Sequence, residues 1–451
     1  MTPRAIAMHI LLQVARHASF PDVLLDIYLK EHPALDPRDR ALVTELVYGV
    51  LRWQGRLDWI IDQQAKTKPD KIALPVRVIL RLATYQLLFL DRIPAAAAVN
   101  EAVKLAKTSQ PPHVVRFVNG ILRAISRKRE ILQKAQLEGS SENRLSVLYS
   151  YPAWLVQRWL AALGYQETEA LCAAGNHVPP TTIRVNTLKT TVEALAGSLR
   201  DLGFSAEPGN LAPEALHLRS IRTDISSLVQ YRGGEFQVQD EASQLIAHLV
   251  QPQPGEHILD ACAGFGGKST HLAQLMENQG KITASDNQGW KLTRLVENAK
   301  RLQISNIEPV EMDVLELQPS AEQRYFDRIL LDAPCTGLGV LRRNPDIKWK
   351  VKPKDFHRLH LVQTQMLSRL APLLKPEGVL VYATCTVSSE ENEGTLKGFL
   401  SENPDYHLES ARPYLPTGCG GTVNPMGALQ TWPHKHGVDG FYAARLRRIR
   451  G

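Results

Sequence analysis

The sequence predicts an α/β fold: a doubly wound, mostly parallel sheet, preceded by an all-α domain and a small α+β connecting subdomain. Two observations carry this prediction. From about residue 236 onward, short strand-like runs alternate with helical stretches, a pattern typical of a parallel sheet covered by helices on both faces. Before residue 130, apolar residues recur only at helical spacings of three and four.

The domain boundaries follow from these changes in pattern. We expect an all-α domain over residues 1–135, an α+β subdomain over 145–232 and the sheet domain over 233–451. The polar stretch QKAQLEGSSENRLS (133–146) is typical of a linker. The pieces TTIRVNTL and ALHLRS predict two strands of the connecting subdomain.

Composition excludes several classes of protein. No run of 18 apolar residues occurs, and the first residues lack the pattern of a signal peptide. The five cysteines contain no CxxC pair, so we expect neither a disulfide framework nor a metal site. A cytoplasmic location, without a membrane partner, fits these features.

The basic charge is concentrated in the N-terminal third. Residues 1–150 hold 22 Lys and Arg against 14 Asp and Glu, an excess larger than the +7 of the whole chain. The helical segment VVRFVNGILRAISRKRE ends in a strongly basic turn. An ordinary solvated surface is one interpretation, but clustered cations favour a phosphate-binding surface.

The first strand of the sheet domain, HILDAC, is followed by the glycine turn AGFGGKST. Gly264, Gly266 and Gly267 allow close approach of the backbone to a ligand. A phosphate-binding loop would need GxxxxGK[ST], and its first glycine would fall on Cys262, so an ATPase loop is disfavoured. The second interpretation of the glycine turn, a site for an adenosyl ligand, remains.

Aspartates close the next three strands. Asp286 ends KITASD, where a carboxylate can accept hydrogen bonds from ribose hydroxyls. Asp313 ends EPVEMD, where it can meet an adenine edge, and Asp332 ends the strand of LLDAP. Each one could instead be a helix cap or turn residue, but their repetition at successive strand ends favours a binding site.

Cys335 in DAPCTG and Cys385 in YATCTVSSEENE also follow strands of this sheet. A lone cysteine is usually a small buried hydrophobe. Two thiols beside an adenosyl site suit another chemistry: a thiolate adds to carbon 6 of a pyrimidine, which makes carbon 5 nucleophilic toward the methyl group of S-adenosylmethionine. Asp332 is then a candidate acid for ring N3.

The segment LGVLRRNPDIKWK (338–350) interleaves cations with an aromatic residue. Arg342, Arg343, Lys348 and Trp349 suit phosphate contacts and base stacking. The alternative is an ordinary exposed basic loop.

Several of these motifs, taken together, resemble those of the Sun-type RNA cytosine-C5 methyltransferases. They are YRGGEFQVQDEASQL, CAGFGGK, DAPCTG, ATCTVSSEENE and GVDGFYAARLRR. The N-terminal domain resembles the NusB-like RNA-binding domain that bacterial members acting on 16S rRNA carry. Both resemblances together cover nearly the whole chain.

The resemblance implies an enzyme that uses S-adenosylmethionine to methylate a cytosine of 16S rRNA, free or in an early small-subunit particle. It implies a monomer that does not act on DNA, with Cys385 as nucleophile, Cys335 assisting product release and Asp332 beside the base. The implied cofactor residues are Cys262, Ala263, Gly264, Phe265, Gly266, Gly267, Lys268, Asp286, Asp313 and Asp332.

One departure and two alternatives stand beside this expectation. The family's loop commonly reads CAAPGGK, whereas Gly264 and Phe265 replace Ala and Pro here. Phe265 could pack on the cofactor or on the following helix, and we favour the helix. The chain could instead be an RNA-binding or antitermination factor with an inactive methyltransferase domain. The same chemistry could also act on tRNA or large-subunit rRNA.

Overall fold

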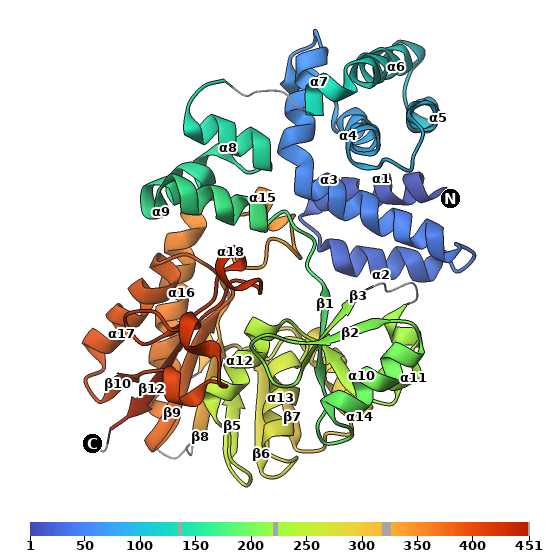
Figure 1. Ribbon diagram of the computed structural model, residues 1–451. Coiled ribbons are helices and arrows are strands. Elements are labelled where there is room, and N and C mark those ends of the chain that lie inside the picture. The colour runs from blue at the N-terminus through green and yellow to red at the C-terminus, as the bar shows by residue number, and fades with distance from the viewer. Residues whose placement is uncertain (134–137, 220–223, 318–325, 450–451) are drawn as a thin grey trace. The chain divides into compact units, whose positions relative to one another are not determined.

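The computed structural model describes residues 1–133, 138–219, 224–317 and 326–449 (Figure 1). Contacts divide the chain into two units, residues 1–177 with 341–350, and residues 178–340 with 351–451. Among the described residues, no helix combines the length and apolar character needed to span a membrane.

The first unit is helical, as predicted for residues 1–133; it also holds residues 145–177, which were expected in the connecting subdomain, and the segment 341–350. Its helices are α1 (Pro3–His17), α2 (Pro21–Glu31), α3 (Pro37–Gln64), α4 (Leu74–Phe89), α5 (Ala95–Ser109), α6 (Pro112–Arg127), α7 (Arg129–Gln133), α8 (Ser141–Tyr149), α9 (Ala153–Ala174) and α15 (Ile347–Lys350). Proline opens several of them, where its fixed φ and missing N–H carry no cost. The Asp36 carboxylate caps α3 by accepting a hydrogen bond from the Asp39 N–H at 2.8 Å.

The prediction of a linker at 133–146 is wrong over its second half. Ser140 is the N-cap of α8, and its hydroxyl accepts a hydrogen bond from the Asn143 N–H at 3.3 Å. The polar residues that suggested a linker are therefore the start of a helix, because Ser and Asn favour helix N-termini as well as turns. Residues 134–137 lie outside the described part of the chain.

The segment 341–350 packs within the helical unit, and the burial of Lys348 contradicts the expectation that its ammonium contacts RNA; Trp349 is half-buried. The Lys348 side chain is fully buried; its ammonium donates to Asn176 Oδ1 at 2.6 Å and lies 3.7 Å from the centre of the Tyr151 ring. The Trp349 indole N–H donates to the Leu51 carbonyl of α3 at 2.8 Å. These residues anchor a chain segment and present no free cation.

The second unit begins with a four-stranded antiparallel sheet in the order β2-β3-β1-β4. Its elements are β1 (Thr181–Val185), α10 (Val192–Asp201), β2 (Ser205–Pro208), β3 (Ala215–Arg219), α11 (Val229–Arg232) and β4 (Phe236–Val238). The two strands expected from TTIRVNTL and ALHLRS are β1 and β3, which pair with each other.

A larger mixed sheet follows in the order β10-β12-β9-β8-β5-β6-β7, with β11 paired to β12. Its strands are β5 (His257–Asp260), β6 (Lys281–Asp286), β7 (Ile307–Glu311), β8 (Phe326–Asp332), β9 (Leu374–Thr384), β10 (Tyr406–Glu409), β11 (Leu429–Gln430) and β12 (Tyr442–Arg448). The five strands β5 to β9 are parallel, as predicted, and β12 runs antiparallel to β9.

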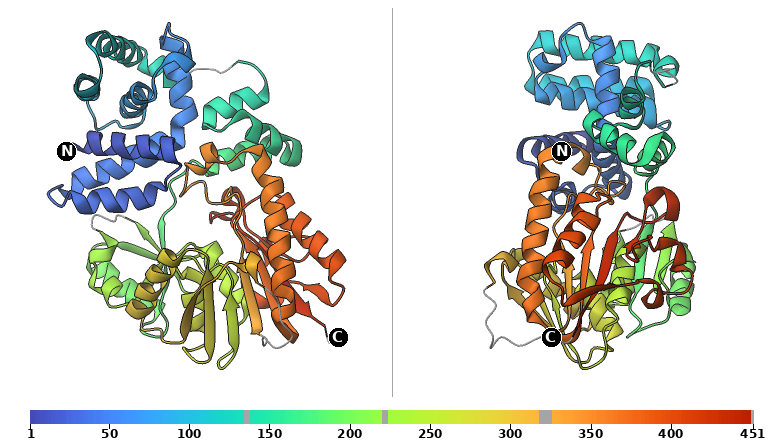
Figure 2. Two further views of the ribbon diagram at one scale, coloured as in Figure 1. Left: turned by 180° about the vertical axis from the view of Figure 1, so that it is seen from behind. Right: turned by 90° about the vertical axis from the view of Figure 1, so that its left-hand side faces the viewer.

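Helices cover both faces of this sheet (Figure 2). They are α12 (Glu241–Val250), α13 (Gly267–Leu275), α14 (Gly289–Leu302), α16 (Pro353–Leu370), α17 (Thr395–Glu402) and α18 (Pro433–His436). Successive strand residues point to opposite faces: Ile258 packs in the core with α12 and α13, whereas Leu259 packs in the core with α16 and α17. The doubly wound α/β prediction is therefore confirmed.

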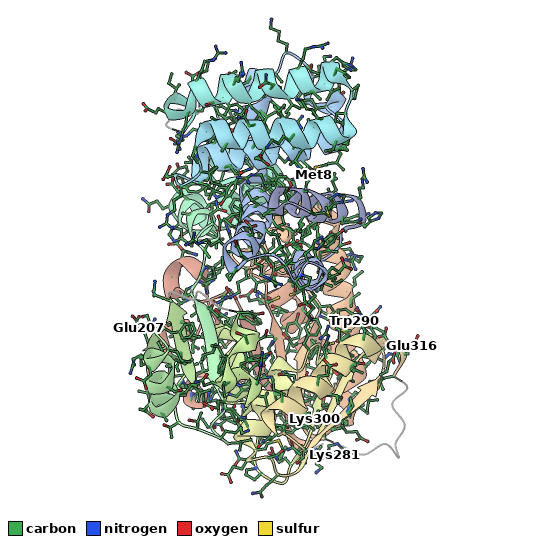
Figure 3. The ribbon with its side chains drawn as sticks, turned by 90° about the vertical axis from the view of Figure 1, so that its right-hand side faces the viewer. Met8, Glu207, Lys281, Trp290, Lys300 and Glu316 are labelled. Carbon is green, nitrogen blue, oxygen red and sulfur yellow. The ribbon has the colours of Figure 1, made fainter. Side chains whose placement is uncertain are left out.

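The carboxyl ends of β5 to β9 meet at one edge of the sheet. The order reverses beside β5, which pairs with β6 on one side and β8 on the other, and ligands of such sheets bind at this switch point. In Figure 3, Trp290, just past β6, lies at this edge, and Lys281, the first residue of β6, lies at the opposite edge.

Candidate active site

The turn between β5 and α13 takes a path that requires glycine. Gly264 and Gly266 have φ values of 54° and 79°, a region that residues with a Cβ avoid. A Cβ at Gly266 would stand 2.5 Å from Cγ of the buried Leu295, whereas one at Gly264 would meet nothing within 4 Å. The turn therefore packs closely on α14 at Gly266 and opens outward at Gly264.

Asp260 anchors this turn from beneath, a role that the sequence did not reveal. The Ser269 hydroxyl, in the first turn of α13, donates to Asp260 Oδ2 at 2.7 Å. The carboxyl is fully buried, and this burial raises its pKa to about 6, against the hydrogen bond from Ser269.

A pocket of about 310 Å³ lies beside the turn, a size within the range of small-molecule sites. Its lining residues are Ala261, Cys262, Gly264, Asp286, Asn287, Gln288, Lys291, Met312, Asp313, Val314, Asp332, Pro334 and Met366. The candidates from the glycine turn and the three aspartates thus converge here. Ala263, Phe265, Gly266, Gly267 and Lys268 belong to the same turn, but they are not among the lining residues.

Asp286 and Asp313 both line the pocket, and Asp286 is also a turn residue and Asp313 a helix cap, so the two interpretations of each hold together. Asp286 accepts hydrogen bonds from the Gly264 N–H at 3.1 Å and the Gln288 N–H at 3.0 Å. Asp313 accepts one from the Leu315 N–H at 2.9 Å. These bonds fix both carboxylates at the rim of the pocket.

Lys268 and Asp332 form an ion pair next to the pocket. Their Nζ and Oδ2 atoms are 2.5 Å apart, and the ammonium lies 5.2 Å from the centre of the Phe441 ring. Burial lowers the pKa of Lys268, but Asp332 and the nearby Cys385 outweigh it and raise that pKa above its usual value. Lys268 is therefore a permanently charged donor at this position.

We expected Phe265 to pack on the following helix, α13, but its ring lies elsewhere. Its ring meets that of Trp290, at the start of α14, edge to face at 5.5 Å between centroids, and both side chains are 48% exposed. Phe265 stands where the family commonly has proline, so the backbone φ at this position is not fixed as proline would fix it. The aromatic ring is therefore able to point outward.

Cys335 and Cys385 meet just beyond the ends of β8 and β9. Their Sγ atoms are 3.4 Å apart. The hydrogen bond that the Cys335 thiol donates to Cys385, together with burial, raises the pKa of Cys335 well above its usual value. Cys335 is thus a thiol that stays protonated beside a second sulfur.

A buried polar cluster joins the antiparallel sheet to α12 and α13. Glu214, His248 and His271 place one potential metal-ligand atom each within 4.8 Å of one another. The fully buried Arg184 is close enough for the charge of Glu214 to raise its pKa, although burial lowers it overall. Because that cation already balances the carboxylate, a divalent metal would add uncompensated buried charge, and we interpret the cluster as structural.

The helical unit presents a basic stripe on α6. Arg116, Arg123 and Arg127 are exposed and lie on one helical face, separated by about 10 Å and about 6 Å along the axis. Within the described part of the chain no hydrogen bond or ion pair joins them to another residue, and α6 has no acidic residue. The stripe therefore offers three free guanidinium groups.

Three family models match the chain. They are "16S rRNA methyltransferase RsmB/F" over residues 247–447, "NusB family" over 1–127 and the ferredoxin-like domain of RsmF/B-like methyltransferases over 151–224. The "Probable ribosomal RNA small subunit methyltransferase B" of Synechocystis sp. is 38% identical and covers 99% of this chain and 100% of the relative. The protein of that name from Bacillus subtilis is 37% identical, with 99% and 98% covered.

Solved structures agree with these relatives. The crystal structure of PH0851 superposes with a TM-score of 0.83 at 28% identity and covers 99% of both chains. NSun6 from Pyrococcus horikoshii with SFG, an analogue of S-adenosylmethionine, gives a TM-score of 0.61 at 25% identity and covers 67% of this chain and 100% of its own. The chain therefore belongs to the RsmB/F family of S-adenosylmethionine-dependent rRNA methyltransferases, with a NusB-type domain at its N-terminus.

Proposed function

We propose that this enzyme methylates carbon 5 of a cytosine in 16S rRNA through a covalent bond between Cys385 and carbon 6. The observation that supports this most directly is the pair of thiols 3.4 Å apart at adjoining strand ends, next to a pocket lined by Asp332 and Pro334. The names of the relatives support the small-subunit rRNA as substrate. The enzyme acts as a monomer on free RNA or an early assembly particle, in the cytoplasm.

The pocket residues suit an adenosyl group. Asp286 is placed to accept hydrogen bonds from the ribose hydroxyls and Asp313 to meet the adenine edge, with Cys262 and Gly264 of the turn lining one side. The open space beyond Gly264 leaves room for the ligand. When bound, S-adenosylmethionine supplies an electrophilic methyl group.

The cysteines and the ion pair perform the other steps. The thiolate of Cys385 adds to carbon 6, and the carboxyl group of Asp332, in its protonated form, gives its proton to N3, where negative charge develops. The Asp332 carboxylate that remains is stabilised by Lys268 and takes the proton back from N3 when the product is released. After carbon 5 is methylated, its proton passes to water and the electron pair restores the double bond between carbons 5 and 6. The bond to sulfur breaks, its electrons return to Cys385, and the protonated Cys335 stabilises that leaving thiolate by a hydrogen bond.

The target cytosine must leave its stack to reach this site, so an unpaired segment of RNA is the natural substrate. The arginine stripe of α6 supports the assignment of RNA binding to the helical unit, because exposed cations without acidic partners gain from counterion release at phosphates.

Single-cysteine variants test the chemistry. Cys385→Ala abolishes methylation of a 16S transcript, whereas Cys335→Ala accumulates a covalent RNA–protein adduct that migrates slowly on a denaturing gel. Cys419→Ala, a buried thiol elsewhere in the unit, serves as the matched control and behaves like the wild type. An adduct with Cys385→Ala instead would reverse the two roles.

Two measurements separate the alternatives. Calorimetry that detected no binding of S-adenosylmethionine would favour an inactive domain on an RNA-binding factor. Bisulfite sequencing of total RNA from a deletion strain identifies the substrate, and a lost methyl group on tRNA or large-subunit rRNA, with 16S rRNA unchanged, would overturn that assignment.

A further inference from the structure

A buried carboxylate connects the two loops that carry the cysteines. Glu391 lies in the π-helical turn Glu390–Gly394 after β9, and its side chain is fully buried. Oε2 accepts hydrogen bonds from the Thr336 N–H at 2.8 Å and from Gln363 Nε2 at 3.2 Å, and Oε1 accepts one from the Thr336 hydroxyl at 2.5 Å. Both oxygens are thus engaged without solvent.

The donors come from residues adjacent to the reacting sulfurs. Thr336 directly follows Cys335, and Thr386 directly follows Cys385. The two threonine hydroxyls are 2.7 Å apart, and that of Thr386 also lies 3.4 Å from Glu391 Oε1. One carboxylate therefore binds the residues that directly follow both cysteines, Thr336 through its N–H and hydroxyl and Thr386 through its hydroxyl.

A third element completes the arrangement. Gln363, on α16, donates both to Glu391 and to the Pro334 carbonyl at 2.9 Å, on the other side of Cys335. Cys335 is held on both sides by groups that depend on Glu391, whereas its sulfur is left free to meet Cys385. The charge of Glu391 also contributes to the raised pKa of Cys335, after the hydrogen bond that Cys335 donates to Cys385 and after burial.

A buried carboxylate is a costly way to connect two loops. Burial disfavours the charged form and raises the pKa of Glu391, although its hydrogen bonds oppose this. An amide of the same size would fill the space without that cost, but it could not accept hydrogen bonds at both of its terminal atoms. The use of a glutamate at this position therefore calls for a reason other than packing.

We propose that Glu391 is a positioning residue for product release, which holds the Cys335 thiol against the Cys385 sulfur when the bond to carbon 6 breaks. This inference rests on the proposed function, because it gives Glu391 a task only in the cysteine-linked reaction. Glu391 itself does not touch the substrate; it acts through Thr336 and Thr386.

The test compares Glu391→Gln with a matched control in the same turn, Glu393→Gln. Glu393 is half-buried; it accepts a hydrogen bond from Asn424 Nδ2 at 3.4 Å, and within the described part of the chain no hydrogen bond joins it to the cysteine loops. Each variant is incubated with S-adenosylmethionine and the 16S transcript. The covalent adduct is quantified on a denaturing gel, and cofactor affinity is measured by calorimetry.

We expect Glu391→Gln to raise the steady-state amount of adduct about tenfold, because the variant loses one charge-assisted hydrogen bond. The affinity for the cofactor should be unchanged. Glu393→Gln should match the wild type. In the double variant Cys335→Ala/Glu391→Gln, the adduct should not exceed that of Cys335→Ala alone, because both changes remove the same assistance.

Other outcomes overturn the inference in distinguishable ways. Slower methylation without extra adduct, with weaker cofactor binding and a lower Tm, would mean that Glu391 only stabilises the fold. If Cys335→Ala itself gave no adduct, the cysteine-linked mechanism would fail first. If Cys335→Ala gave an adduct and Glu391→Gln did not, only the positioning role would be lost.

Discussion

The glycine turn gives two substitutions of the same kind with different expected costs. Gly264→Ala and Gly266→Ala each add one methyl group to a residue of positive φ in the same turn. Both reduce the freedom of the unfolded chain equally, so that effect cancels in their comparison. The difference between them therefore reports on what surrounds each Cβ in the folded state.

The expected magnitudes follow from the geometry. Alanine at positive φ costs about 1–2 kcal/mol at either position. At Gly266 the new methyl group also stands 2.5 Å from Leu295 Cγ, an atom close to the backbone of a fully buried residue, and such overpacking costs about 1–3 kcal/mol more. We expect Gly266→Ala to lose about 2–5 kcal/mol in all, and Gly264→Ala only about 1–2 kcal/mol.

Urea unfolding and calorimetry with S-adenosylmethionine measure both effects. Gly266→Ala should lower the urea midpoint more than Gly264→Ala does and should weaken the binding of S-adenosylmethionine, because the turn must move away from α14. Gly264→Ala should retain binding, since alanine is the family's usual residue there. Equal destabilisation of the two variants, or loss of the cofactor only in Gly264→Ala, would refute this account of the turn.

Two further predictions concern charge. Replacing Arg116, Arg123 and Arg127 by Gln should reduce the slope of log K against log salt for RNA binding by about 2–3, whereas Arg129→Gln, already paired with Asp91, should change it little. For Asp260, the folded protein keeps a proton between pH 3.8 and about 6, whereas the unfolded chain has released it. The unfolding free energy of the wild type, relative to that of Asp260→Asn, should therefore fall by up to about 3 kcal/mol as the pH rises through this range. A difference that did not change with pH would contradict the raised pKa.

The sheet and the candidate pocket were predictable because their signals are local. Alternating strand and helix patterns identified β5 to β9, and a parallel sheet brings the carboxyl ends of its strands together. Asp286, Asp313 and Asp332 could therefore be placed at one pocket from their positions alone. The approach of Cys335 and Cys385 follows from the same geometry, since β8 and β9 are neighbours.

What the sequence did not reveal depends on contacts between distant segments. Glu391 belongs to the motif ATCTVSSEENE, but its partner Thr336 lies 55 residues earlier, and nothing in the local sequence indicates that pairing. Asp260 looked like one more residue of a buried strand. Phe265 was expected to pack on α13, the helix that follows it, because the sequence contains no sign that the ring of Trp290 lies beside it.

The segment 341–350 shows why charge alone does not identify an RNA contact. A lysine between an isoleucine and a tryptophan resembles a nucleic-acid-binding loop, yet Lys348 is saturated by acceptors of the helical unit, among them the carbonyls of Arg52 and Ser150 at 3.3 Å. The arginines of α6, in contrast, lie on one face of a regular helix whose apolar residues account for the other face. Regular amphipathic spacing predicts exposure, whereas an irregular mixture of cations and aromatics does not. For that reason we propose that the phosphate contacts of this enzyme lie on α6, whereas residues 341–350 pack within the helical unit.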